Sequence, residues 1–189
     1  MLKKELRRKF GTQRKALKRE EVVNLSLAIA NKSLGLPIWD RNYYHTFLPI
    51  FKQNEIDTSF ILSILQGKDK EVIIPKITGE NGLSHFLLTD GTTLAENDWG
   101  IPEPVNGIPI TPEHIDVVFV PLLIFDLNGN RVGYGKGFYD RFLEQCRPET
   151  IKVGLSLFDP INAITDISVT DITLNYCVTP KTVYTFDAS

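Results

Sequence analysis

The sequence predicts an α/β fold: a single domain with a largely parallel or mixed open sheet and helices on both of its faces. Three observations support this fold class. Segments with helical spacing of apolar residues alternate with short β-branched and aromatic runs. The most apolar run, at 117–125, suits a strand that is covered on both faces. A glycine-rich stretch at 133–137 follows this run and precedes another helical segment, as is common in open α/β sheets.

Three helical regions are expected. Apolar residues recur at near-helical spacing in the first 35 residues, which should form a helical segment packed on the domain. A second helix should begin at Asp57 or Thr58, either of which can cap it, and stop at Gly67. A third is expected at 138–146.

Strands are expected between these helices and after them. The segments with strand-like composition are 43–50, 71–75, 84–89, 117–125, 152–157 and, as one or two strands, 177–186. Residues 96–114 are rich in Pro, Gly and Asn and have no periodicity, which predicts a long functional or disordered loop. The segments on either side of this loop have similar composition, so residues 1–189 are interpreted as one domain.

Composition and charge exclude several classes of protein. The chain has 189 residues, with 21 Lys and Arg against 23 Asp and Glu and a net charge of -2. Proteins that bind duplex nucleic acid normally carry a positive excess, so we expect no nucleic-acid partner. The two cysteines, Cys146 and Cys177, have no short spacing, which supports neither a disulfide framework nor a zinc site.

The N-terminal segment is basic and amphipathic, a pattern shared by mitochondrial presequences and membrane-surface helices. Its acidic residues Glu5, Glu20 and Glu21 weaken both readings. No run of 18 apolar residues occurs. We therefore expect a cytoplasmic protein without a membrane partner.

The strongest local signal is the block from Arg131 to Arg141, which reads RVGYGKGFYDR. Glycines at alternate positions let a backbone approach a phosphate, and Lys136 adds a positive charge. Neither G-x-x-x-x-G-K-[ST] nor G-x-G-x-x-G fits. The alternative is a tight glycine turn that only reverses the chain.

Three carboxylates are candidates for a metal site beside this loop. Asp140 falls in the first turn of the expected helix, where a carboxylate either interacts with the helix dipole or holds Mg²⁺ beside a polyphosphate. Asp126 and Asp171 are the others, and spacing alone does not choose between them.

Several motifs together resemble the 5-formyltetrahydrofolate cyclo-ligase family, also called 5,10-methenyltetrahydrofolate synthetases. The resemblance covers nearly the whole chain. Its motifs are Lys3-x-x-Leu6-Arg7, Glu55-Ile56-Asp57-Thr58, Trp99-Gly100-Ile101-Pro102-Glu103-Pro104, Phe125-Asp126, the block from Arg131 to Arg141, Asp171 and Thr179. It implies a ligase of folate one-carbon metabolism that cyclises 5-formyltetrahydrofolate, with or without further glutamyl residues, to 5,10-methenyltetrahydrofolate. It also implies use of ATP and Mg²⁺, release of ADP and phosphate, an N5-iminium phosphate intermediate, and a monomer or weak dimer.

The resemblance further implies roles for individual residues. ATP would contact Lys3, Lys4, Glu5, Leu6, Arg7, Arg131, Val132, Gly133, Tyr134, Gly135, Lys136, Gly137, Phe138 and Tyr139. Folate would contact Arg7, Ile50, Glu55, Trp99, Tyr134, Gly135, Lys136, Gly137 and Phe138. Lys136, Arg131 and Tyr139 would be catalytic, and Asp140 and Asp171 would hold Mg²⁺.

Plainer interpretations and other function classes stay open at this point. Lys3 could be a solvated helix charge, Glu55 a residue ahead of a helix cap, and Trp99 part of the core. A non-catalytic nucleotide-binding module and a relative of sugar-phosphate isomerases or CoA-transferases are the alternative functions. A fold alone does not decide among them.

Overall fold

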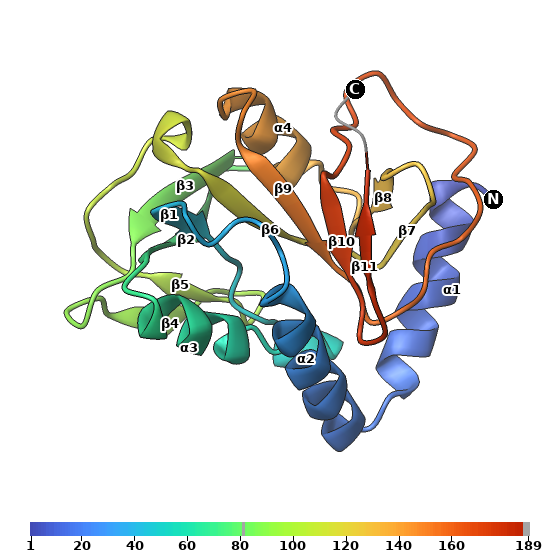
Figure 1. Ribbon diagram of the computed structural model, residues 1–189, viewed down its shortest axis with the longest axis horizontal. Helices are drawn as coiled ribbons and strands as arrows, with labels where there is room; N and C mark the ends of the chain where they lie inside the picture. The colour runs from blue at the N-terminus through green and yellow to red at the C-terminus, as the bar shows by residue number, and fades with distance from the viewer. Residues whose placement is uncertain (81, 187–189) are drawn as a thin grey trace.

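The computed structural model describes residues 1–80 and 82–186; the predicted domain also includes 81 and 187–189, which lie outside the described residues. The main feature of the fold is a seven-stranded sheet of order β11-β10-β9-β6-β1-β2-β3 (Figure 1). The bounds are β1 Tyr43–His45, β2 Glu71–Thr78, β3 Gly82–Leu87, β6 Val117–Pro121, β9 Ile151–Leu155, β10 Tyr176–Val178 and β11 Val183–Thr185. Strands β10, β9, β6, β1 and β2 are mutually parallel, whereas β3 and β11 pair antiparallel at the two edges. The predicted fold class, a mixed α/β sheet in one domain, is confirmed.

Helices cover both faces of this sheet, as predicted. Helices α2 (Arg19–Ser33) and α3 (Ser59–Gly67) pack on one face, and α4 (Phe138–Gln145) packs on the other (Figure 1). Helix α1 (Lys3–Ala16) packs instead on the small hairpin of β7 (Ile124–Phe125) and β8 (Arg131–Val132). The expected N-terminal helical segment is therefore two helices, with a break at Leu17 and Lys18.

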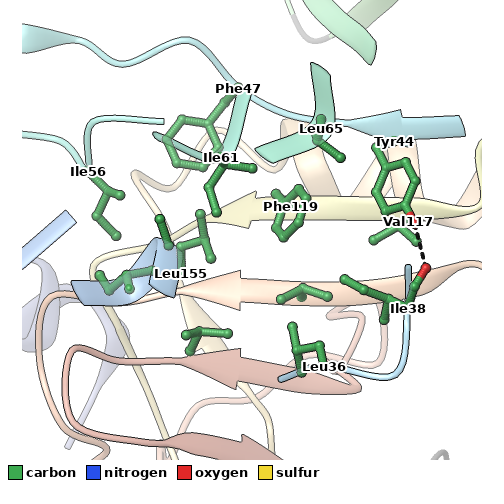
Figure 2. Packing of buried hydrophobic residues seen from close by; sticks show 14 of the residues in the cluster. Leu36, Ile38, Tyr44, Phe47, Ile56, Ile61, Leu65, Val117, Phe119 and Leu155 are labelled. Atoms are coloured by element: carbon green, nitrogen blue, oxygen red, sulfur yellow. Dashed lines mark hydrogen bonds between the residues drawn. The ribbon is translucent and has the colours of Figure 1, made fainter. Parts of the chain in front are cut away.

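Successive side chains of β6 point to opposite faces of the sheet, so the core has two layers. Val117 and Phe119 face α2 and α3, whereas Val118 and Val120 face α4, and all four side chains are fully buried. Figure 2 shows the first layer, in which Phe119 lies beside side chains of α3 and of the neighbouring strands. Successive residues of this strand must be apolar because both sides are covered, which explains the apolar run in the sequence.

Two predicted strands are shorter than expected. The strand at 43–50 ends at His45, and the strand at 117–125 is divided into β6 and β7, which belong to different sheets. Pro121 is the last residue of β6, and a proline has no N–H to offer a neighbouring strand. Beyond it the chain leaves the main sheet. An apolar run does not reveal such a change of direction, because both strands are buried.

The segment 96–114, expected to be a long functional or disordered loop, contains regular elements instead. It contains most of a hairpin formed by β4 (Leu94–Glu96) and β5 (Pro102–Pro104), followed by a 3₁₀ turn at Pro112–His114. These strands have three residues each, too few to show periodicity. The remaining predicted elements are present, with ends shifted by up to three residues. Among the described residues, no helix is long and apolar enough to cross a membrane.

Two histidines are buried together between the sheet and α4. The rings of His45 and His85 lie 5.1 Å apart, and both contact the ring of Phe142. Burial lowers the pKa of His45 well below its usual value, and the neighbouring His85 lowers it further. Burial alone lowers the pKa of His85 to about 4. Both imidazoles are therefore neutral in the folded protein at neutral pH.

This pair predicts loss of stability in mild acid. A histidine with a lowered pKa in the folded state takes up its proton more readily when unfolded, so stability is present above pH 6.5 and falls as the pH drops toward 4. For His85 alone, the free energy of unfolding should fall by about 2 kcal/mol between about pH 7.5 and about pH 5. Urea unfolding at the two pH values measures this difference. His85→Leu should reduce it, whereas His114→Asn, a change at an exposed histidine, should leave it unchanged; an equal pH dependence in all three proteins would contradict the prediction.

Candidate active site

A cavity of about 730 Å³ opens at the carboxyl ends of the central parallel strands. Its wall includes Pro75 and Ile77 from the end of β2, Pro121 from the end of β6, and the segment that follows β1. The loop 133–137 before α4, called the glycine loop below, and the first turns of α1 complete the wall of the cavity. This is the edge at which open α/β sheets bind their ligands.

The glycine loop adopts backbone conformations that other residues rarely take. Gly135 has φ +95° and Gly137, which caps α4, has φ +68°. A Cβ at Gly135 would lie 3.0 Å from Cζ of Arg7, and a Cβ at Gly137 would lie 2.8 Å from Nη1 of Arg141. Both glycines therefore allow a guanidinium to lie against the backbone of the loop.

Arg7 connects α1 to this loop. Its Nε donates a hydrogen bond of 3.0 Å to the carbonyl oxygen of Gly133. One turn earlier, Lys3 forms an ion pair with Asp171. The N-terminal helix and the loop after β8 are 126 residues apart between Arg7 and Gly133, yet they form one wall of the cavity.

A second ion pair lies at the base of the loop. Nη2 of Arg131 is 2.6 Å from Oδ1 of Asp140, and the Arg131 side chain is only 6% exposed. Arg131 also donates to the carbonyl oxygen of Ile172, and Oδ1 of Asp140 accepts the Ile172 amide at 3.1 Å. Burial lowers the pKa of Arg131, while the charges of Asp140 and Asp171 oppose that effect. Arg131 therefore acts chiefly on its protein neighbours, holding Asp140 and the segment around 171–172 together.

Glu55 and Tyr134, which both line the cavity, contact each other directly. Tyr134 donates a hydrogen bond of 2.5 Å to Oε1 of Glu55, and Oε2 of Glu55 accepts the Ile50 amide at 2.7 Å. Arg14, a buried residue of α1, donates to the hydroxyl oxygen of Tyr134. Burial raises the pKa of Glu55, and the hydrogen bonds from Tyr134 and Ile50 and the charge of Arg14 oppose that rise.

Tyr139 contributes a further polar atom to the wall. Its hydroxyl is buried and has no hydrogen-bond partner among the described residues. Burial raises the pKa of Tyr139, and the Glu55 charge raises it further. The group is therefore a protonated donor rather than a base.

The structure brings most of the predicted site residues together around this one cavity. Those that line the cavity are Lys3, Arg7, Ile50, Glu55, Trp99, Arg131, Gly133, Tyr134, Gly135, Lys136, Gly137, Phe138, Tyr139, Asp140 and Asp171. Four do not. Lys4 and Glu5 point to solvent, with Glu5 accepting the Leu2 amide, while Leu6 and Val132 are buried in the core between α1 and β8.

Sequence reasoning did not single out Arg14, Glu103 or Arg141, which the structure places in or beside the cavity. Glu103 is buried on its wall, and Arg141 lies against Gly137. Glu103 belongs to the Trp-Gly-Ile-Pro-Glu-Pro motif at 99–104, which is the sequence signal for this residue. A charged residue of a basic helix, such as Arg14, gave none.

Two of the three candidate metal-binding carboxylates line the cavity, and the third does not. Asp126 is fully buried away from the cavity, where its carboxylate accepts hydrogen bonds from Asn128, Asn130 and Ile164. Asp140 and Asp171 both line the cavity, each with one oxygen bound to protein groups. Within the described residues, no cluster of three or more His, Cys, Asp or Glu could hold a metal ion. Two carboxylates in one cavity fit Mg²⁺, which commonly takes one or two carboxylates and completes its shell with water and phosphate oxygens.

Comparisons with known proteins agree on one family. A family model described as the 5-formyltetrahydrofolate cyclo-ligase family matches residues 1–175. The 5-formyltetrahydrofolate cyclo-ligase of Mus musculus is 28% identical over 152 residues, which cover 76% of this chain and 74% of the mouse protein.

Two solved structures share the fold. The 5,10-methenyltetrahydrofolate synthetase of Aquifex aeolicus superposes with a TM-score of 0.77 at 33% identity and covers 98% of this chain and 93% of its own. A 5,10-methenyltetrahydrofolate synthetase from Mycoplasma pneumoniae superposes with a TM-score of 0.72 at 22% identity, over 95% of this chain and 99% of its own. The second, at this identity, supports the fold alone.

The contacts of Arg14 predict how Glu55 titrates. Arg14→Met removes a positive charge and the donor to Tyr134, so the pKa of Glu55 should rise beyond its already raised value. Carboxyl-carbon NMR of Glu55 across a pH titration measures the change. Lys15→Met removes a charge from the exposed side of the same helix and should have no effect. An unchanged Glu55 titration in Arg14→Met would show that Arg14 does not act on this carboxylate.

Proposed function

Because this chain belongs to the 5-formyltetrahydrofolate cyclo-ligase family and is a ligase, we propose that it converts 5-formyltetrahydrofolate to 5,10-methenyltetrahydrofolate with ATP and Mg²⁺, releasing ADP and phosphate. The observation that carries the finer proposal is the division of the cavity. Cationic side chains reach the cavity from α1 and the glycine loop, whereas apolar side chains and the buried Glu103 reach it from β2, β3 and the β4–β5 hairpin; the other buried carboxylate, Glu55, is bonded to Tyr134 of the loop. Membership of a ligase family sets aside the non-catalytic module and the isomerase or transferase relative.

The cationic end suits the phosphates of ATP. The loop precedes α4, and the first amides of a helix have no partner within the helix and can bind an anion; Lys136 lies within the loop. Lys3 and Arg7 approach from α1. Mg²⁺ held by Asp140 and Asp171 would neutralise charge on the transferring phosphoryl group.

The apolar end suits the folate. Ile50, Ile77 and Ile101 provide apolar surface, and the largely exposed Trp99 adds an aromatic ring. Glu55 offers a carboxylate to N–H donors of the reduced pterin. The formyl group then lies between the two ends, where it meets the terminal phosphate of the nucleotide.

The reaction proceeds in two steps. The formyl oxygen attacks the γ-phosphorus, and the bond from that phosphorus to the β–γ bridging oxygen breaks, so ADP leaves. The resulting N5-iminium phosphate carries an activated carbon. N10 attacks that carbon, loses its proton, and the C–O bond to phosphate breaks, which leaves the methenyl bridge between N5 and N10.

Protein groups stabilise charge in these steps rather than form covalent bonds. Lys136 would interact with charge that develops on the transferring phosphoryl oxygens. Tyr139, with its buried and protonated hydroxyl, would donate to a substrate oxygen in the cavity. Arg131 would act by holding Asp140 in place.

We further propose that residues 1–189 act as one cyclo-ligase domain, in the cytoplasm, as a monomer or weak dimer. The net charge of -2 and the absence of a long apolar run in the sequence support this setting. The substrate and ATP are then its partners, and no nucleic acid is required.

The decisive experiment is a coupled assay of both products. The purified protein is incubated with 5-formyltetrahydrofolate, ATP and Mg²⁺, and the near-ultraviolet absorbance of the methenyl product is followed together with phosphate release. One phosphate should appear per methenyl group, and none without the folate. Folate-independent phosphate release, or absence of the methenyl product, would reject the proposal.

Lys136→Ala should lower kcat by about 10²-fold and raise the KM for ATP, because a charge aimed at the phosphoryl group interacts most strongly in the transition state. Steady-state kinetics with ATP as the varied substrate measures both constants. Lys32→Ala, at an exposed position of α2, is the control. A rise in KM with unchanged kcat would limit Lys136 to nucleotide binding.

Asp140→Asn should lower the rate by about 10²-fold or more and raise the Mg²⁺ concentration that gives half-maximal activity. Since Asp140 also pairs with Arg131, the melting temperature of the variant is measured alongside, to separate a loss of folded protein from a loss of metal affinity. Glu149→Gln removes an exposed charge just beyond α4 as a control. Half-maximal activity at the wild-type Mg²⁺ concentration would remove Asp140 from the metal site.

A further inference from the structure

Glu103 is a buried carboxylate at the apolar end of the cavity. It lies on β5, is 9% exposed, and lines the cavity together with Ile101 and Pro102 of the same hairpin. Its Oε1 accepts the amide of Ile77 in β2 at 2.8 Å. Because β1 pairs with β2 only up to Ile73, this amide lies beyond the end of the parallel ladder.

The charge of Glu103 is not balanced by a nearby cation. Within residues 1–80 and 82–186, no Lys, Arg or His forms an ion pair with it. Three other acidic groups of the cavity differ in this respect: Asp140 pairs with Arg131, Asp171 pairs with Lys3, and Glu55 is bonded to Tyr134, whereas Glu144 is exposed to water. A buried carboxylate needs hydrogen-bond donors to offset its loss of water.

The Ile77 amide supplies only part of that need. An ionised carboxylate has about four acceptor positions, of which this amide uses one. The other residues that β2, β3 and positions 101–102 of the same hairpin contribute to the cavity wall, including Pro75, Leu83 and Ile101, have apolar side chains that donate nothing. Further donors must therefore come from whatever occupies the cavity.

We propose that Glu103 binds the 2-amino and N3–H edge of the pterin ring of 5-formyltetrahydrofolate, an inference that rests on the proposed function. A 2-amino-4-oxo pyrimidine presents two adjacent N–H donors in one plane. A carboxylate accepts such a pair through two parallel hydrogen bonds, as it does from arginine. The apolar wall then holds the faces of the ring, and Glu103 determines which edge points inward.

The adenine of ATP fits this position less well. Its amino group is flanked by ring nitrogens that are acceptors, and these would face the second carboxylate oxygen without a hydrogen atom between them. Glu55 is also less suited to this edge, because its two oxygens already accept from Tyr134 and Ile50. The two carboxylates therefore have separate tasks, with Glu103 selecting the 2-amino-4-oxo ring.

The test compares two ligands on two proteins. Glu103→Gln keeps a carbonyl oxygen for the Ile77 amide but turns an N–H₂ group toward the pterin donors. Calorimetric titration uses 5-formyltetrahydrofolate and its 2-desamino-2-methyl analogue, which lacks the 2-amino donors. Wild type should bind the parent about 10- to 100-fold more tightly than the analogue, since an unpaired buried polar group is costly. Glu103→Gln should lose most of that preference while binding ATP as wild type does.

One control variant, a check of folding and three contrary outcomes define the test. Glu96→Gln, an exposed change on the paired strand β4, should keep the wild-type preference, and the melting temperature should confirm that Glu103→Gln is folded. A preference for the parent that survives in Glu103→Gln would reduce Glu103 to a partner of the Ile77 amide and overturn the proposal. Weakened ATP binding with unchanged folate binding would overturn it as well. Failure of wild type to bind 5-formyltetrahydrofolate at all would instead reject the proposed function.

Discussion

The close approach of the Arg7 guanidinium to the backbone of Gly135 is the contact on which the cavity depends. A side chain at position 135 would place its Cβ 3.0 Å from Cζ of Arg7, and the φ of +95° there strains any residue other than glycine, so glycine suits both the loop backbone and the close approach of Arg7. The hydrogen bond from Arg7 to Gly133 fixes the same contact. Because α1 also buries Leu6 and Phe10 against the β7–β8 hairpin, the position of one cationic wall follows from the packing of an apolar face.

The cavity combines groups of opposite charge in a small volume, and their separation determines the chemistry it supports. Two of its carboxylates are paired with cations, Asp140 with Arg131 and Asp171 with Lys3. Glu55 and Glu103 lie on the wall without such ion pairs in the described part of the chain. A polyanion is thus favoured beside the cations of α1 and the glycine loop, and a neutral ring rich in N–H donors beside Glu103.

Runs of apolar residues in the sequence predicted the buried strands reliably, but not where those strands end. The run at 117–125 predicted a strand covered on both faces, and the two apolar layers around Val117 to Val120 confirm that reading. The same run did not reveal the break after Pro121, since β7 is as buried as β6. Short elements were missed for a related reason. Three residues, as in β4 or β5, are too few to show a period of two.

The sequence by itself determined the fold class, the family resemblance and most of the residues that line the cavity, because these depend on local periodicity and on contiguous motifs such as the block from Arg131 to Arg141. Tertiary structure alone decided which of these side chains face one another. It separated Arg7 from its neighbours Lys4, Glu5 and Leu6, directed Glu103 to the wall, and placed Arg14 behind Tyr134. Side-chain direction depends on helix phase and on contacts between segments more than one hundred residues apart, and neither is encoded in a motif of a few residues.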